Sequence, residues 1–323
     1  GLSIILLGHP AQPPPVGASP LWKQNPSTAG LSLQGRQAWL AMNNAVELTQ
    51  VIRPLGPVQA AFRDSLLRIA EGMQTQADLD VLKERLTASV GAAERSTFDD
   101  AVHIFPINAA ADQCNWRRMT SLRTPIARIN AKHTIPGYST VSSDRFRGLQ
   151  PHIFLAIGAR VFINNNVWVS ASLANGAVGE VVPMQWAVGQ APPHLPEVVW
   201  VRMENYRGPQ CFEESLRREW GDGQIDLTNL CPIAPIVARD DQPPAGRRRS
   251  DGTTNDTSSA RCFRMQLPLM LAFGITIHKS EGITLLRCFL DIGTSERSNG
   301  QSFTAFSRCR TLDNIHAPRA LLP

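Results

Sequence analysis

The pattern of apolar and polar residues predicts helices in several spans before residue 100. Residues 58–72 place their apolar side chains on one face of a helix, and Gly72 is positioned to stop it. Thr75 predicts the cap of a second helix, with Asp78 close to its positive end. A weaker helical pattern covers residues 35–50. These three spans are therefore expected to be helical.

Other stretches favour strands. The apolar residues 1–8 predict a buried strand, and residues 100–107 predict another that leads at Asn108 into a helix through Cys114. After Gly148 the pattern changes to short strands, predicted at 159–163, 179–182 and 197–203, with a turn at Asn175-Gly176. The section from 148 to 237 is thus expected to be β-rich.

A polar stretch from 238 to 260, which contains Arg247-Arg248-Arg249, predicts a disordered loop. From Phe263 the chain returns to an α/β pattern. The simplest account is an α/β protein that carries an inserted β module.

Length and composition exclude several classes of protein. At 323 residues the chain is long enough for two domains with an ordinary core. No apolar run reaches the eighteen or so residues of a membrane span, so no membrane partner is expected. The first apolar run lacks the basic start of a signal peptide. Because the chain begins with Gly1 and not Met, this run is expected to be a strand of a longer protein.

The net charge of +5 is compatible with a polyanionic partner but does not identify one. Most cations are arginines, which reflects either coding bias or phosphate recognition. The six cysteines lie far apart without a Cys-x-x-Cys pair, which argues against zinc and against a secreted disulfide framework. Reduced thiols are expected.

The most informative stretch is Ile275–Thr284, followed by Phe306–Arg310. A short apolar run and then a polar cluster closed by glycine predict a buried strand that enters a strand-to-helix turn. Such a turn places backbone N–H groups, a hydroxyl and a cation together, which suits phosphate chemistry.

Together with three further segments, these two stretches resemble motifs V and VI of superfamily-one DNA helicases of the petite-integration-frequency type, including the relatives carried by Helitron transposons. The other segments are Gly8–Val16 (motif III), Leu48–Arg53 (motif IV) and the run from Phe105 to Asn115. The resemblance covers nearly the whole chain in the family's order. It implies an α/β, RecA-like motor with 5′ to 3′ polarity. The implied parts are a first-domain remnant (1–45), the second motor domain (46–147 and 261–323), an inserted small β-barrel (148–237) and a disordered loop (238–260).

The resemblance also implies roles for individual residues. The implied nucleotide-binding residues are Gln12, Arg53, Glu281, Gly282, Arg308 and Arg310. Gln12, Arg53 and Arg308 would act in catalysis, with Arg308 as the arginine finger, because phosphoryl transfer needs a permanently cationic bidentate side chain. The implied DNA-binding residues are Asn108, Thr276, His278, Lys279 and Ser280. No residue is assigned to a metal.

The family uses ATP and Mg²⁺ and acts on single-stranded or forked DNA. This chain has no glycine-rich loop ending in Gly-Lys-Ser/Thr and no matching acidic strand end. It is therefore expected to bind ATP and Mg²⁺ unproductively by itself and to need an N-terminal motor half as partner. The implied compartment is the nucleus or the mitochondrion.

Three interpretations remain open. The chain is a piece of an ATP-dependent helicase, a non-catalytic nucleic-acid-binding remnant of transposon origin, or an unrelated α/β protein with chance matches. His9, Pro54 and Glu281 depart from the family's residues and favour the second interpretation, whereas five ordered matches make the third improbable.

Overall fold

The computed structural model describes residues 5–14, 20, 31–48, 59–134, 137–211, 228–240, 262–293, 296 and 298–318. The chain divides into two compact units, one of residues 1–108 and 276–323 and the other of residues 109–275. Each is described by itself below.

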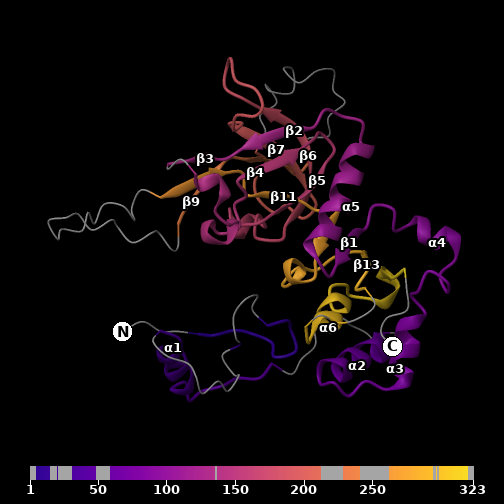
Figure 1. The fold of residues 1–323 in the computed structure, drawn as a ribbon. Helices are drawn as coiled ribbons and strands as arrows, with labels where there is room; N and C mark the ends of the chain where they lie inside the picture. Colours follow the sequence, from indigo (N-terminus) through magenta and orange to yellow (C-terminus); the bar gives the residue numbers. More distant parts are fainter. Residues whose placement is uncertain are drawn as a thin grey trace. The chain divides into compact units, whose positions relative to one another are not determined.

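The first unit is built on a four-stranded sheet in the order β12-β1-β13-β14 (Figure 1). Its strands are β1 (Val102–Phe105), β12 (Gly274–Thr276, where the chain re-enters this unit), β13 (Cys288–Leu290) and β14 (Ile315–His316). β1 and β14 both run parallel to β13. Parallel strands need crossover connections and cover on both faces, and Ile104, Leu290 and Ile315 are accordingly fully buried.

The described residues of the first unit also form helices. They are α1 (Leu31–Leu40), α2 (Ala60–Ala70), α3 (Gln76–Lys83), α4 (Ala92–Ser96) and α6 (Gln301–Phe306). α2 packs against both α3 and α6. Its apolar face buries Phe62 and Leu66, and α3 adds Leu82. The predicted helix over 58–72 is therefore confirmed.

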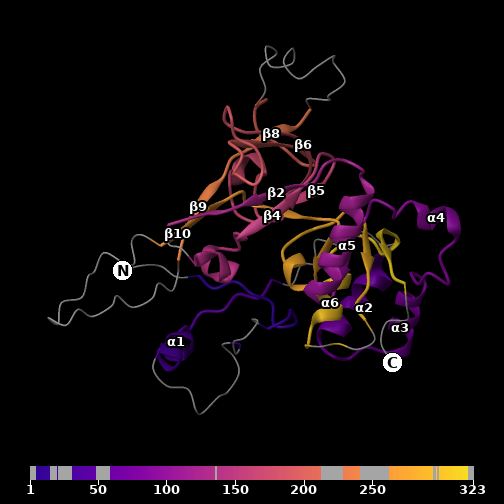
Figure 2. The same ribbon diagram turned by 45° about the horizontal axis from the view of Figure 1, so that its top comes forward.

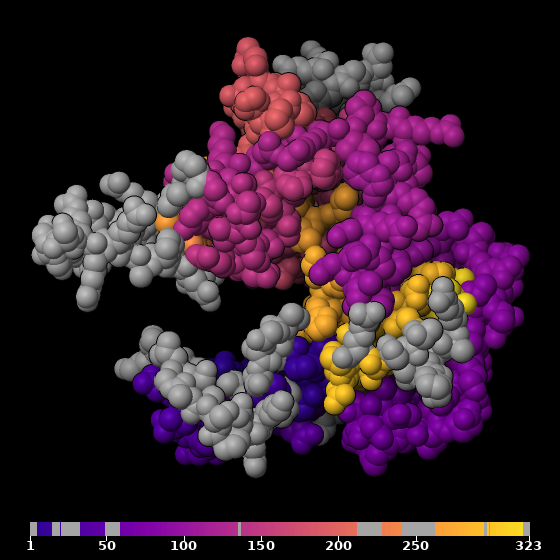
Figure 3. All heavy atoms as spheres, in the orientation of Figure 1, coloured from indigo at the N-terminus to yellow at the C-terminus, as the bar shows by residue number. Residues whose placement is uncertain are grey.

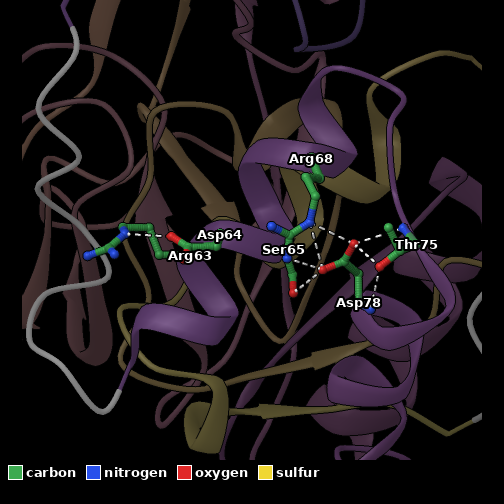
Figure 4. A network of polar contacts seen from close by, with 6 residues as sticks. All are labelled: Arg63, Asp64, Ser65, Arg68, Thr75 and Asp78. Atoms are coloured by element: carbon green, nitrogen blue, oxygen red, sulfur yellow. Dashed lines mark hydrogen bonds and ion pairs between the residues drawn. The ribbon is translucent and has the colours of Figure 1, made fainter.

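The turn between α2 and α3 is fixed by a polar network around the buried carboxylate of Asp78 (Figure 4). Thr75 and Asp78 form the reciprocal capping box that the sequence predicts. Asp78 also accepts hydrogen bonds from Ser65 Oγ (2.8 Å) and from Arg68 Nε (2.9 Å to Oδ2) on α2. A single carboxylate thus joins the two helices.

The second unit holds most of α5 (Asn108–Ser121) and three sheets (Figure 2). The largest sheet has the order β11-β5-β6-β7-β8. Its strands, all antiparallel to their neighbours, are β5 (Arg160–Ile163), β6 (Val178–Gln185), β7 (Val198–Met203), β8 (Leu230–Ile233) and β11 (Leu269–Leu271). The predicted turn at Asn175-Gly176 lies between β5 and β6.

Two smaller sheets complete this unit. β2 (Ala127–Asn130) and β4 (His152–Leu155) form an antiparallel ribbon, and β3 (Lys132–His133), β10 (Phe263–Gln266) and β9 (Ile236–Arg239) form a sheet in the order β3-β10-β9. The inner face of the ribbon, with Ile129 and Leu155, joins a core that includes Val161, Val181 and Val201. Closure of these strands into a barrel stays a prediction.

One buried cation organises a loop of the second unit. Arg264 on β10 is fully buried, lies 4.3 Å from the centre of the Phe146 ring and donates to the carbonyl oxygens of Leu149, Tyr138 and Val141 at 2.7–2.8 Å. Because one charged side chain donates to three carbonyls of the same segment, Arg264 holds the loop over residues 138–149 against the strand.

Three element predictions need correction. The predicted strand over 1–8 is wrong for residues 5–8, which are irregular and exposed, because no described strand pairs with them. The helix predicted over 35–50 begins earlier and ends at Leu40, shortly before the poor helix formers Asn43 and Asn44. The loop predicted over 238–260 starts later, because residues 238–239 belong to β9 and Asp240 is buried against Arg145. Residues 241–260 lie outside the described residues.

Unit boundaries also differ from the sequence-based domains. The β-rich unit spans residues 109–275, whereas the sequence placed the β-rich section at 148–237. The wider span follows from pairing, since β3 joins β10 and β5 joins β11 across a long sequence separation.

Candidate functional site

The motif V segment contains a strand followed by one tight turn. β12 ends at Thr276, and a single 3₁₀ turn follows over His278–Ser280. Gly282 then adopts φ +77°, a left-handed conformation that favours glycine. The predicted strand and turn are confirmed, but a 3₁₀ turn takes the place of the expected helix start.

The predicted DNA-binding residues of this turn differ in exposure. Thr276 and Ser280 are buried, and the hydroxyl of Ser280 donates to the carbonyl oxygen of Ile277 at 2.6 Å. His278 is half-buried and Lys279 is exposed. Lys279 is therefore the residue of the turn best placed to contact a ligand from solvent.

Glu281 follows the turn and is half-buried. Burial raises the pKa of its carboxyl, while the nearby positive charges of His278 and Arg308 lower the pKa. A carboxylate at this place would repel phosphate unless it is paired or protonated. The raised pKa favours the protonated form.

Motif VI follows α6 directly, and its first arginine points into the protein. Arg308 is 2% exposed and donates to the carbonyl oxygens of Thr304 (Nε, 2.7 Å) and Ser280 (Nη1, 2.8 Å). Its Nη2 also donates to the hydroxyl of Ser307 at 2.7 Å. Arg308 thus joins motifs V and VI, a contact that the sequence did not predict.

Arg310, two residues later, is exposed. Of the two motif VI arginines, Arg310 has its side chain at the surface, whereas Arg308 is held by main-chain carbonyls. Their roles toward a nucleotide stay predictions.

The motif III segment lies on α6. The His9 ring stacks on Phe303 with ring centres 5.1 Å apart. Gly300, at φ +84°, immediately precedes α6. A Cβ atom added to this glycine would lie 2.1 Å from the carbonyl oxygen of Ala11, so only glycine permits this close approach. Figure 3 shows these N-terminal residues, in blue, against the yellow C-terminal segment. Gln12 is half-buried beside them, so the loop predicted to sense the nucleotide touches the helix that leads to Arg308.

A pocket of about 440 Å³ lies beside this contact. The residues that line it are Pro10, Ala11, Ile69, Ala70, Glu71, Gly72, Gln74, Leu79, Leu82, Glu296, Asn299, Gly300, Ser302, Phe303 and Phe306. This lining includes two carboxylates and neither lysine nor arginine. A triphosphate needs cations or N–H donors, so we do not assign the phosphates to this pocket.

The remaining predicted residues lie elsewhere. Asn108 is exposed at the first position of α5. Asn115, one of the residues that carry the resemblance, binds both backbone groups of Gly274 at 2.7 Å and so fixes the start of β12. Arg53 lies outside the described residues. Within those residues, no group of three or more His, Cys, Asp or Glu side chains could hold a metal ion, and no described helix is long and apolar enough to cross a membrane.

Comparisons with known proteins place the chain among helicases. No family model matches it. It is 24% identical over 350 residues to the ATP-dependent DNA helicase PIF1 of Emericella nidulans, covering 99% of this chain and 42% of that protein. It is 24% identical over 352 residues to PIF7 of Trypanosoma brucei brucei (98% and 32%), and 27% identical over 201 residues to human PIF1 (62% and 24%). The chain is a homologue of Pif1-type DNA helicases.

Solved Pif1 structures share the fold. Bacteroides Pif1 bound to single-stranded DNA matches with a TM-score of 0.57 and 21% identity, over 96% of this chain and 61% of that one. Pif1 from Candida albicans matches with a TM-score of 0.55 and 18% identity, over 84% and 55%. The chain therefore has a RecA-like helicase fold, and it spans less than half the length of the curated Pif1 relatives named above.

Proposed function

We propose that this chain forms the second motor domain, with its β-rich insertion, of a Pif1-type helicase that uses ATP to move along single-stranded or forked DNA. The proposal is supported mainly by the alignment with a curated PIF1 over 99% of the chain. The hydrogen bond from Arg308 to Ser280 adds support, because it joins the two segments that carry the most specific resemblance. A nuclear or mitochondrial location belongs to the same proposal.

In this proposal the exposed Lys279 contacts a DNA phosphate, and His278, Thr276, Ser280 and Asn108 shape the same channel. Gln12, Arg53, Glu281, Gly282, Arg308 and Arg310 face the nucleotide. ATP supplies the phosphoryl group, whose developing charge the arginines stabilise. No described residue is assigned to Mg²⁺, because the described part of the chain offers no matching cluster of ligands.

A second candidate is a DNA-binding remnant without motor activity. Three observations favour it: His9 and Glu281 replace the family's residues, and the Arg308 guanidinium is held by main-chain carbonyls. Such a protein would keep the DNA surface and lose ATP-driven movement.

The first test is equilibrium binding of a fluorescent oligothymidylate. We expect the affinity to fall steeply as salt rises, since phosphate contacts release counterions. Lys279→Ala should weaken binding and make the slope of log K against log salt shallower by about one. Lys83→Ala is the matched control, because Lys83 is also exposed and lies on α3, outside the segments assigned to DNA. A flat salt dependence, or equal effects of the two substitutions, would argue against the channel.

A further inference from the structure

The outer face of the β2–β4 ribbon carries aromatic rings where a solvent-facing surface usually carries polar side chains. His152 and Phe154 alternate with the buried Ile153 and Leu155 along β4. The two outer rings meet edge to face with centres 5.6 Å apart. The strand alternation therefore places both rings on the opposite side of β4 from Ile153 and Leu155, where His152 is exposed and Phe154 is half-buried and also packs against the core.

α5 adds a third ring to this face. Trp116 is 51% exposed, and its ring meets Phe154 edge to face at 5.7 Å. The preceding residue, Asn115, is bonded to both backbone groups of Gly274 on β12, which anchors this turn of α5. A large ring left half in water is costly unless something covers it.

Cations flank the rings. Arg128 on β2 is exposed and lies directly across the ladder from Phe154, and its Nε donates to Asn130, which lies across from His152. Lys132 continues the same exposed alternation. The two strand segments, 127–133 and 152–155, contain no aspartate or glutamate. Asp112, one helical turn before Trp116, is the nearest carboxylate along α5.

We propose that this ring platform, made of Trp116, Phe154, His152 and Arg128, binds single-stranded nucleic acid by stacking unpaired bases. Flat rings suit bases because every base has a π-face, and a neighbouring guanidinium suits the backbone phosphate. A duplex would hide its bases from these rings. The platform shares its class of ligand with the proposed function but uses different residues, all in the second unit.

The test compares two tryptophans of this unit. Trp116→Ala is expected to weaken binding of a fluorescent oligothymidylate roughly tenfold, whereas Trp168→Ala, which removes an indole that is 44% exposed, should change it less than about twofold. Trp116→Phe should recover most of the affinity. Circular dichroism spectra and melting temperatures of all variants control for folding.

Two readouts separate stacking from a general loss of charge or fold. Trp116→Ala should leave the salt slope unchanged, while Arg128→Ala should make it shallower by about one. An oligonucleotide with abasic sites should bind wild type and Trp116→Ala equally. If the abasic strand binds wild type as tightly as oligothymidylate does, the platform does not stack bases and a different partner covers it.

The outcomes also separate this inference from the proposed function. If Lys279→Ala weakens binding and Trp116→Ala does not, the platform is wrong and the channel stands. If only Trp116→Ala weakens binding, the platform stands and the channel is wrong. If wild type fails to bind oligothymidylate at low salt, both are contradicted.

Discussion

Arg308→Ala is expected to lower the free energy of unfolding of the first unit by about 3 kcal/mol or more. The side chain is 2% exposed and donates to two main-chain carbonyls and one hydroxyl. Its removal breaks three hydrogen bonds from a charged donor, each of which contributes about 1.5–3 kcal/mol. The carbonyls of Ser280 and Thr304 keep one other donor each, the Ile283 N–H (3.1 Å) and the Ser307 hydroxyl (2.9 Å). Urea unfolding measures the total, and hydrogen exchange over residues 276–285 locates the loss.

Arg310→Ala is the matched control, since this arginine lies two residues away and is exposed. It should change stability by less than about 0.5 kcal/mol. Equal losses in the two variants would contradict the view that Arg308 joins motifs V and VI.

Asp78→Ala is expected to lower the melting temperature by several degrees, because one buried carboxylate joins α2 to α3 (Figure 4). Its hydrogen bonds from Arg68 and Thr75 hold the pKa of Asp78 far below its ordinary value of 3.8. A group whose pKa is lowered by folding stabilises the fold above its unfolded pKa and loses that contribution as pH falls below it. Thermal melts between about pH 3 and pH 6 measure the effect.

Asp78→Asn separates charge from shape, because the amide keeps the volume but loses the ionised acceptor. Wild type should lose its stability advantage over Asp78→Asn as pH falls below 4 or so. Asp80→Ala, which changes an exposed carboxylate on the same helix, is the control and should have a small effect. An advantage that stays constant down to pH 3 or thereabouts would show that folding does not lower the pKa of Asp78.

Local signals predicted local structure well. The cap at Thr75 and the apolar face of α2 follow from spacing alone, because both depend on residues within one or two helical turns. The strand at 102–105 and the helix from Asn108 are likewise where the sequence placed them. The strand predicted over 1–8 failed over residues 5–8 because a strand needs a partner, and an apolar run does not tell whether one exists.

Contacts between distant segments were not predictable from one sequence. The residues around Arg308 in the sequence do not reveal that its guanidinium donates to the Ser280 carbonyl. Likewise, the residues around Gly274 do not reveal that the Asn115 side-chain amide forms hydrogen bonds with both the N–H and the C=O of Gly274. The face on which Phe154 lies could have been predicted from the sequence. Side chains alternate between the two faces of a strand, so Phe154 lies on the other face of β4 from Ile153 and Leu155. The exposed position of Trp116 depends on how α5 meets the ribbon, which the sequence does not state.

The most direct test of the motor account is ATP hydrolysis stimulated by single-stranded DNA. The chain alone should give no turnover, because it lacks the glycine-rich phosphate loop. Fused behind the part of Bacteroides Pif1 that lies outside the matched region, it should hydrolyse ATP in a DNA-dependent manner. Arg308→Lys should reduce that rate by roughly a thousandfold, as expected for an arginine finger. A folded fusion that binds single-stranded DNA but shows no DNA-stimulated turnover would contradict the account and favour a DNA-binding remnant.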